Sequence, residues 1–163
     1  MSRPPSFDPA LLSLRLQASG PASAQTLATE LGVERRTVQR ALRGLGGGIV
    51  KLGTTRGTRY ALRRSVLGQN TPHVFSRLSP TTGIAHQWGS LTALHGGWHL
   101  EWESQAVRPD WADQVHDHAG FCEGLPFFLS DLRPQGFLGR AVARRLPGSV
   151  GLPQDPRDWN HDQ

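Results

Sequence analysis

A short stretch in the first third of the chain, ERRTVQRALR at residues 34–43, concentrates the side chains with the clearest chemistry. Four arginines and one glutamine stand there one or three residues apart: Arg35, Arg36, Gln39, Arg40 and Arg43. Arginine can donate two hydrogen bonds to N7 and O6 of guanine, and glutamine can make a similar pair with adenine. Arginine also forms bidentate pairs with phosphate. A helix with these residues on one face would therefore be able to read the major groove of DNA.

The surrounding sequence predicts a helix-turn-helix over residues 24–43. Two helices are expected at residues 24–31 and 34–45, with Ser23 as the N-cap of the first. Gly32 lies between them, and glycine takes the left-handed conformation that ends a helix at low cost. The inward positions of the second helix are apolar, which leaves its arginines and its glutamine on or beside the outward face. These inward residues are Val38, Leu42 and Leu45.

A wing is predicted directly after these helices. Residues 49–53 and 58–62 alternate apolar and polar side chains, as half-buried strands do, and residues 54–57 have the composition of a hairpin turn. With a first helix expected at residues 8–17, the order is that of a winged helix-turn-helix, and the text ERRTVQRALRGL resembles the recognition helix of DeoR-like winged regulators. The residues predicted to bind DNA are Arg35, Arg36, Thr37, Gln39, Arg40, Arg43, Thr55, Arg56 and Arg59.

The charge of the chain is divided unevenly between its two halves. Residues 1–64 hold eleven Lys and Arg against three acids, a net charge of +8, whereas residues 65–163 hold seven arginines against ten acids, a net charge of −3. The basic half is therefore the one expected to face phosphate. A solvated arginine-rich face without a ligand is the alternative that the charge alone leaves open.

Three other chemistries are not predicted from this sequence. The glycine-rich run at residues 44–51 follows a helix, whereas a nucleotide-binding loop needs a strand before the glycines. His95 and His99 have a metal-like spacing but straddle a Gly-Gly turn, and one cysteine provides no thiolate set, so no metal or cofactor is expected. That residue, Cys122, is interpreted as a buried thiol, with a reactive nucleophile as the alternative.

The second half predicts a small antiparallel sheet. Strands are expected at residues 73–78, 87–94 and 98–103, with a turn at 95–97 between the last two. An amphipathic helix is expected at residues 136–146. Trp98, Trp102 and Trp111 are interpreted as core residues, with stacking on nucleic-acid bases as the alternative. The predicted fold is α+β, with a winged helix-turn-helix at 1–64, a linker at 65–71 and a second domain at 72–163.

One passage of the second half carries a resemblance to a known family. The text GFCEGLPFFLSDLRPQGFLGRAVARRL at residues 120–146, with the related stretch at 151–159, resembles HipA-family serine/threonine kinase toxins, in the YjjJ-like branch. The resemblance implies a small N-terminal subdomain in which an apolar Phe-Phe strand leads to a corner, here Leu132–Gly136 with Gln135 where glutamate is commoner. It implies a surface for docking a kinase lobe, made of Phe127, Phe128, Arg133, Pro134, Gln135, Gly136, Phe137 and Arg140.

The family's catalytic lobe is expected beyond residue 163, because no aspartate-centred phosphotransfer motif occurs in this sequence. The chain is therefore expected to be no enzyme itself, but a cytoplasmic DNA-binding transcriptional regulator of a HipA-type toxin–antitoxin system, without membrane contact. Two alternatives stay open: a truncated N-terminal part of such a kinase toxin, or a winged regulator whose second half is an effector or dimerisation domain. Duplex DNA, a kinase lobe and a second copy of the chain are the partners considered.

Overall fold

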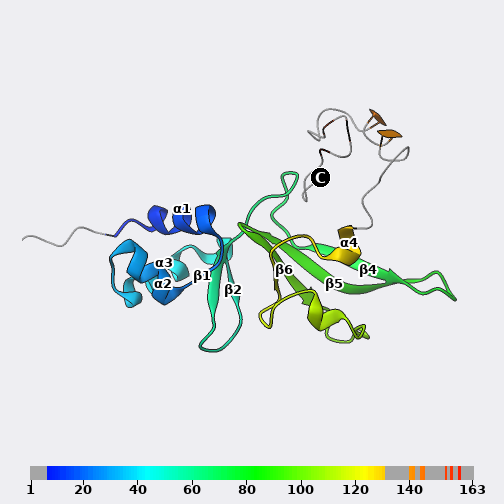
Figure 1. Cartoon of the computed structure of the whole chain (residues 1–163), viewed down its shortest axis with the longest axis horizontal. Coiled ribbons are helices and arrows are strands. Elements are labelled where there is room, and N and C mark those ends of the chain that lie inside the picture. Colours follow the sequence, from blue (N-terminus) through cyan, green and yellow to red (C-terminus); the bar gives the residue numbers. More distant parts are fainter. Residues whose placement is uncertain are drawn as a thin grey trace, which may run out of the picture.

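The computed structural model describes residues 7–130 together with residues 140, 141, 144, 145, 153, 155 and 158. The fold is α+β, as predicted: a helical module with a three-stranded sheet is followed by a four-stranded antiparallel sheet (Figure 1). The helices are α1 (Pro9–Ser19), α2 (Ala24–Leu31), α3 (Arg35–Gly44) and α4 (Phe127–Ser130). The strands are β1 (Ala22–Ser23), β2 (Ile49–Leu52), β3 (Arg59–Leu62), β4 (His73–Leu78), β5 (Ala85–Leu94), β6 (Gly97–Trp102) and β7 (Phe121–Cys122).

The predicted caps of α1 and α2 are present in the structure, whereas α3 begins after Glu34 without a side-chain cap and ends at Gly44. The side chain of Asp8 accepts a hydrogen bond from the Ala10 amide at 2.9 Å, and Ser23 Oγ accepts one from the Thr26 amide at 3.0 Å. Gly32 ends α2 in the left-handed conformation, with φ of 64°. The helices pack around one apolar core whose fully buried members are Leu12, Leu16, Leu27 and Val38.

The wing has one strand more than the sequence predicts. β2 and β3 form the expected hairpin, and the two-residue strand β1 pairs with β3 on its other side. The segment Gly46–Gly48 forms a 3₁₀ turn that leads from α3 into β2. Because β1 directly precedes α2, this pairing ties the start of the helix-turn-helix to the wing.

The second sheet has the strand order β4-β5-β6-β7. Its register shifts between Phe75 and Ser76, which makes Trp88 an extra residue on β5 and turns its ring toward Trp102, 5.2 Å away between ring centroids. Gly89, next along β5, leaves room for the Phe75 ring, because a Cβ on it would lie 2.5 Å from Phe75 Cζ. An aromatic cluster forms on this face from Phe75, Trp88, Trp102, Trp111, Phe127 and Phe128.

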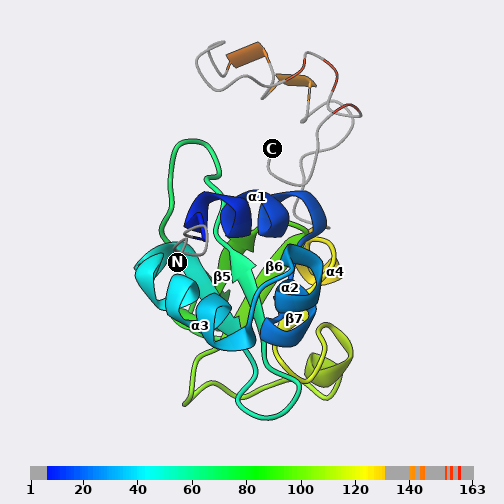
Figure 2. The same ribbon diagram turned by 90° about the vertical axis from the view of Figure 1, so that its left-hand side faces the viewer.

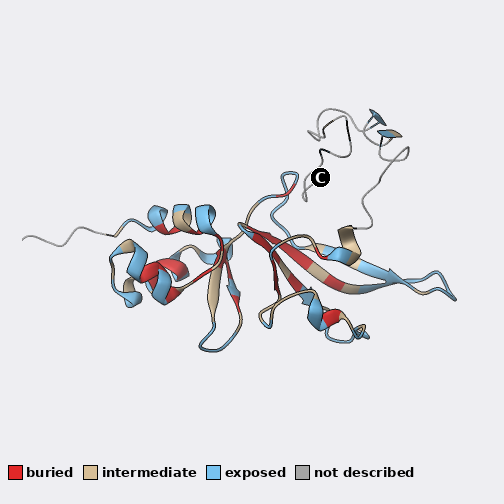
Figure 3. Ribbon diagram, in the orientation of Figure 1, coloured by how far each residue is buried: buried red, intermediate tan, exposed pale blue. Residues whose placement is uncertain are grey.

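The two sheets share a hydrophobic core. Leu94, at the end of β5, is fully buried and packs with Val50, Leu52 and Ala61 of the wing and with Phe121 of β7. Two backbone hydrogen bonds also cross the seam, from His95 N to Leu62 O at 2.9 Å and from Arg64 N to Ala93 O at 3.1 Å. Buried residues accordingly lie on the wing strands and on the ends of β5 and β6 where the two sheets meet (Figure 3). The chain thus leaves the wing after β3, which ends at Leu62, and enters the second sheet with β4 at His73, while the cores of the two sheets are joined.

The strand predicted at Phe127 and Phe128 is wrong, and the elements predicted after it lie mostly outside the residues that the structure describes. Phe127 and Phe128 begin the short helix α4 and not a strand, because Pro126 starts a helical turn in which its carbonyl accepts from the amides of Leu129 and Ser130. The helix predicted at 136–146 and the corner Leu132–Gly136 fall mostly or wholly outside the described residues. The four described residues of that helix are helical: Arg140, Ala141, Arg144 and Arg145.

Candidate nucleic-acid interface

Helix α3 separates its apolar and its basic side chains. Val38, Ala41 and Leu42 are buried against the other helices. The arginines of α3 point away from this core and are exposed. The two uncharged residues predicted to bind DNA are half-buried at the edge of the arginine face. The exposed residues are Arg35, Arg36, Arg40 and Arg43, and the half-buried ones are Thr37 and Gln39. The arrangement gives a basic helix face of the width that the major groove accepts.

A side-chain ion pair supports this helix indirectly. Arg15 on α1 donates to Glu30 on α2 at 2.6 Å between Nη2 and Oε1. The positive charge of Arg15 compensates the Glu30 carboxylate, which therefore does not reduce the positive charge of the α3 face. α2 in turn holds α3 through the turn at Gly32, where the Val33 amide donates to the Ala28 carbonyl at 3.0 Å. The position of the basic face is therefore fixed by all three helices.

A groove of about 400 Å³ runs between α3 and the wing. Gln39 and Arg43 line it from the helix, and Lys51 and Tyr60 line it from β2 and β3. Lys51 was absent from the predicted site, although the alternation of β2 indicates its orientation: Val50 and Leu52 are buried, so Lys51 between them is exposed. It is the one lysine of the sequence, and it adds a cation to the groove beside the recognition helix.

The wing tip presents two of its three predicted contact residues to solvent. Thr55 and Arg56 are exposed in the loop between β2 and β3, which the Thr58 hydroxyl closes by donating to the Thr55 carbonyl at 2.7 Å. Arg59 is different, because its guanidinium pairs with the Asp117 carboxylate and lies 5.1 Å from the centre of the Phe121 ring. In this structure Arg59 thus connects the wing to the second sheet.

Asp117 is the acceptor around which the turn before β7 is built. One of its carboxylate oxygens accepts from the backbone amides of Ala119 and Phe121 at 2.8 and 3.0 Å, and the other accepts from Arg59. Burial by itself would raise the pKa of Asp117, but the amides of Phe121 and Ala119 and the Arg59 guanidinium outweigh it and lower the pKa. The carboxylate therefore stays ionised and its charge is compensated within the chain.

The cysteine, the two histidines with metal-like spacing and Trp98 lie in surroundings typical of residues that stabilise the fold. Cys122 is buried, as interpreted from the sequence, and burial raises the pKa of its thiol to about 11, so it is protonated at neutral pH. Burial also lowers the pKa of both His95 and His99. Within the described part of the chain, no three His, Cys, Asp or Glu side chains are grouped so as to hold a metal ion. Trp98 is only 4% exposed and belongs to the core, which excludes stacking on bases.

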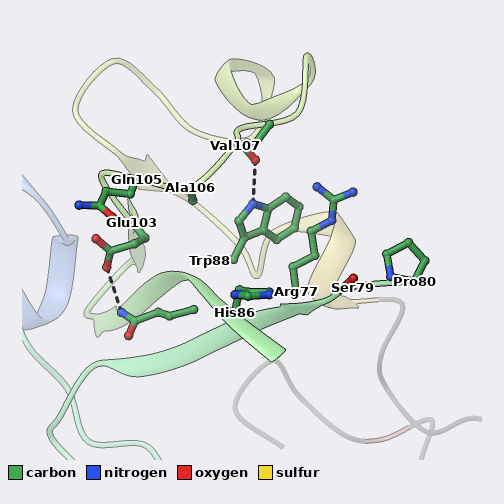
Figure 4. A pocket seen from close by; sticks show the side chains of 10 residues that line it. Arg77, Ser79, Pro80, His86, Trp88, Glu103, Gln105, Ala106 and Val107 are labelled. Carbon is green, nitrogen blue, oxygen red and sulfur yellow. Dashed lines mark hydrogen bonds between the residues drawn. The ribbon is translucent and has the colours of Figure 1, made fainter. Parts of the chain in front are cut away.

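A second hollow, of about 560 Å³, lies at the far end of the second sheet (Figure 4). The Arg77 guanidinium lies 5.7 Å from the centre of the Trp88 ring, and the Trp88 indole donates to the Val107 carbonyl at 3.0 Å. Gln87 donates to Glu103 at 3.3 Å along another side of the hollow. The hollow thus combines an aromatic wall with an arginine that has no carboxylate partner among the described residues.

Comparison with known proteins decides the family. Residues 10–58 match the family described as "HTH domain", and residues 76–163, more than half of the chain, match the family described as "YjjJ-like toxin, middle domain". The chain belongs to the YjjJ-like toxin family. It is also 36% identical over 152 residues to a protein of Escherichia coli (strain K12) named "Toxin YjjJ". That match covers 93% of this chain and 31% of the relative, so the chain spans about a third of the relative's length. No solved structure matches.

The docking residues suggested by the resemblance to this YjjJ-like family are only partly described. Phe127 is 55% exposed on α4, and its ring lies 5.2 Å from that of Trp111, whereas Phe128 is half-buried within the aromatic cluster. Arg140 is exposed. Residues Arg133–Phe137 lie outside the described part of the chain. Within the described part, no helix has the length and apolar character needed to cross a membrane.

Proposed function

We propose that this YjjJ-like chain binds duplex DNA as a transcriptional regulator of a HipA-type toxin–antitoxin system, with α3 in the major groove and the wing on the backbone. The observation that carries the proposal is the exposed arginine face of α3 next to a groove with a lysine of β2 on its other side. The match to an HTH domain supports it. The proposal assigns no catalytic role to these 163 residues.

Replacing Arg40 or Arg36 by alanine is expected to weaken DNA binding by about 1–3 kcal/mol each, the usual cost of losing a specific arginine contact. Both side chains are exposed and far from the apolar face of α3, so the fold should be retained. Affinity for a fragment of the adjacent promoter is measured by fluorescence anisotropy at several salt concentrations, because phosphate contacts give a steep salt dependence.

Arg108→Ala is the matched control for these variants. It removes the same charge from an exposed residue of the second domain, and we expect it to leave the affinity nearly unchanged. If Arg36→Ala, Arg40→Ala and Arg108→Ala all bind as the unchanged chain does, α3 is not the recognition helix and the proposal is wrong.

For the second half we propose that it docks a HipA-type kinase lobe, and the exposed Phe127 is the observation that favours this function. An aromatic ring left 55% exposed at the edge of an aromatic cluster is a common anchor of protein interfaces. Phe127→Ala is expected to reduce co-purification with a co-expressed HipA-type kinase lobe, while Leu14→Ala, which removes a similarly exposed apolar side chain from α1, leaves it unchanged. Equal recovery with both variants, or none with the unchanged chain, contradicts the docking role.

Two other functions remain as alternatives with their own discriminating observations. If the chain is the N-terminal part of a longer kinase toxin, an in-frame continuation follows Gln163 in the genome. If the second half is an effector or dimerisation domain, no kinase lobe co-purifies. The hollow beside Arg77 and Trp88 then offers an effector site. A dimer contact is also available in the first domain, where Leu11 and Leu14 on α1 are 50% and 59% exposed.

A further inference from the structure

The turn before β7 lies directly against the tip of the wing. A Cβ on Gly57 would be 3.7 Å from Nε2 of His118, and a Cβ on Gly53 would be 3.5 Å from the Cβ of Ala119. These two glycines lie at either end of the wing loop, so the turn follows the loop over its whole width. In Figures 1 and 2 the wing loop and the long loop before β7 both extend toward the lower side of the molecule.

This turn is held rigidly by Asp117. The side chain of Asp117 accepts from the Ala119 and Phe121 amides, its carbonyl accepts from the Gly120 amide at 2.9 Å, and its ion pair with Arg59 joins the turn to β3. Phe121, which follows the turn, is buried in the shared core. The side chain between these anchors, His118, is therefore presented from a fixed position although it belongs to a loop.

The charges around His118 favour an anionic ligand. The carboxylate of Asp117 is compensated by Arg59, while Arg56, adjacent to Gly57 in the wing tip, is exposed. His118 itself is exposed and has no hydrogen bond or ion pair to any described residue. A DNA strand carries one phosphate per about 3.4 Å of helix axis, so a donor next to Arg56 has a neighbouring phosphate within reach once Arg56 binds one.

We propose that His118 binds a backbone phosphate of DNA beside the one that Arg56 contacts, so that the second domain contributes directly to the nucleic-acid interface. This inference rests on the proposed DNA-binding function and extends it beyond residues 1–64. It makes the turn at 117–120 a second contact on the wing side of the site, positioned by Asp117.

The test compares the same substitution at two exposed histidines, using a 30-base-pair duplex of arbitrary sequence, since phosphate contacts are independent of sequence. His118→Arg places a permanent charge at the proposed contact and should steepen the slope of log affinity against log salt by about 0.9, the value for one more neutralised phosphate. His86→Arg adds the same charge near the opposite end of β5, about 25 Å from Leu94 by strand rise. For His86→Arg the slope of log affinity against log salt should not change, because the added charge lies far from the DNA and charges are screened within about 10 Å at 0.1 M salt.

Removal of the donor gives a second readout. His118→Ala should weaken binding by about threefold, within the range for one hydrogen bond, whereas His86→Ala should have no effect. If His118→Arg and His86→Arg give the same slope while Arg40→Ala weakens binding, the inference is wrong and the proposed function stands. If the unchanged chain does not bind the duplex at all, both are wrong.

Discussion

Leu94→Ala is expected to lower the free energy of unfolding by about 3–5 kcal/mol, the range for a fully buried leucine whose removal leaves a cavity. Leu94 is 0% exposed and contacts both the wing strands and β7, so the cavity would open between the two domains. The expected consequence reaches beyond stability, because this side chain and Phe121 are the buried apolar residues of the second sheet that pack against the wing. Urea denaturation followed by circular dichroism measures the loss.

Leu91→Ala is the matched control for this prediction. Leu91 lies on the same strand and is 4% exposed, but it packs within the second domain only. Both variants should lose stability, and they should differ in hydrogen exchange of the two amides that bond across the seam, Arg64 and His95. These amides should exchange faster in Leu94→Ala than in Leu91→Ala; equal rates would show that Leu94 does not couple the domains.

The helix-turn-helix could be predicted from the sequence because its determinants are local. Ser23 and Gly32 cap α2 at the predicted residues, and the apolar spacing of Val38 and Leu42 orients α3 with its arginines outward. The strands β4, β5 and β6 were also predicted to within a few residues, since alternation and the turn at Gly96-Gly97 are short-range signals. The same alternation also predicts that Lys51 is exposed between the buried Val50 and Leu52.

Contacts between distant parts of the chain could not be predicted in this way. Arg59 was assigned to DNA because it stands in the wing, yet its partner Asp117 is 58 residues further along and no local pattern connects the two. The sequence predicts Leu94 only as an apolar residue of a strand. The structure shows that its side chain lies between two sheets. Phe127 and Phe128 have the composition of a strand, but the proline before them starts a helical turn.

These long-range contacts change the physical picture of the DNA site. A wing attached only through its hairpin would move independently of the second domain. Here β3 is bounded by β1 on one side and β2 on the other, and its Arg59 is tied to the turn before β7. Substitutions in the second domain that displace β7 should therefore alter the wing as well.

Gly97→Ala tests this consequence with a change far from α3. A Cβ at Gly97 would lie 2.2 Å from the carbonyl oxygen of Cys122 and 2.8 Å from Cζ of Phe121. Both close atoms belong to β7, so the added methyl group would push β7 away from β6. We expect a loss of about 3 kcal/mol in the free energy of unfolding. Phe121 would leave the shared core, and Arg59 would lose the ring on which it stacks.

Thermal and urea denaturation measure the loss, and Gly47→Ala is the control because a Cβ there has no neighbour within 4 Å. We expect the control to change stability by less than about 0.5 kcal/mol, as surface substitutions usually do. Gly97→Ala should additionally weaken binding to duplex DNA at temperatures where it remains folded, since the wing loses its attachment through Arg59 and Phe121. Equal stability of the two variants would contradict the β6–β7 pairing, and a destabilised Gly97→Ala with unchanged DNA affinity would show that the wing does not depend on the second domain.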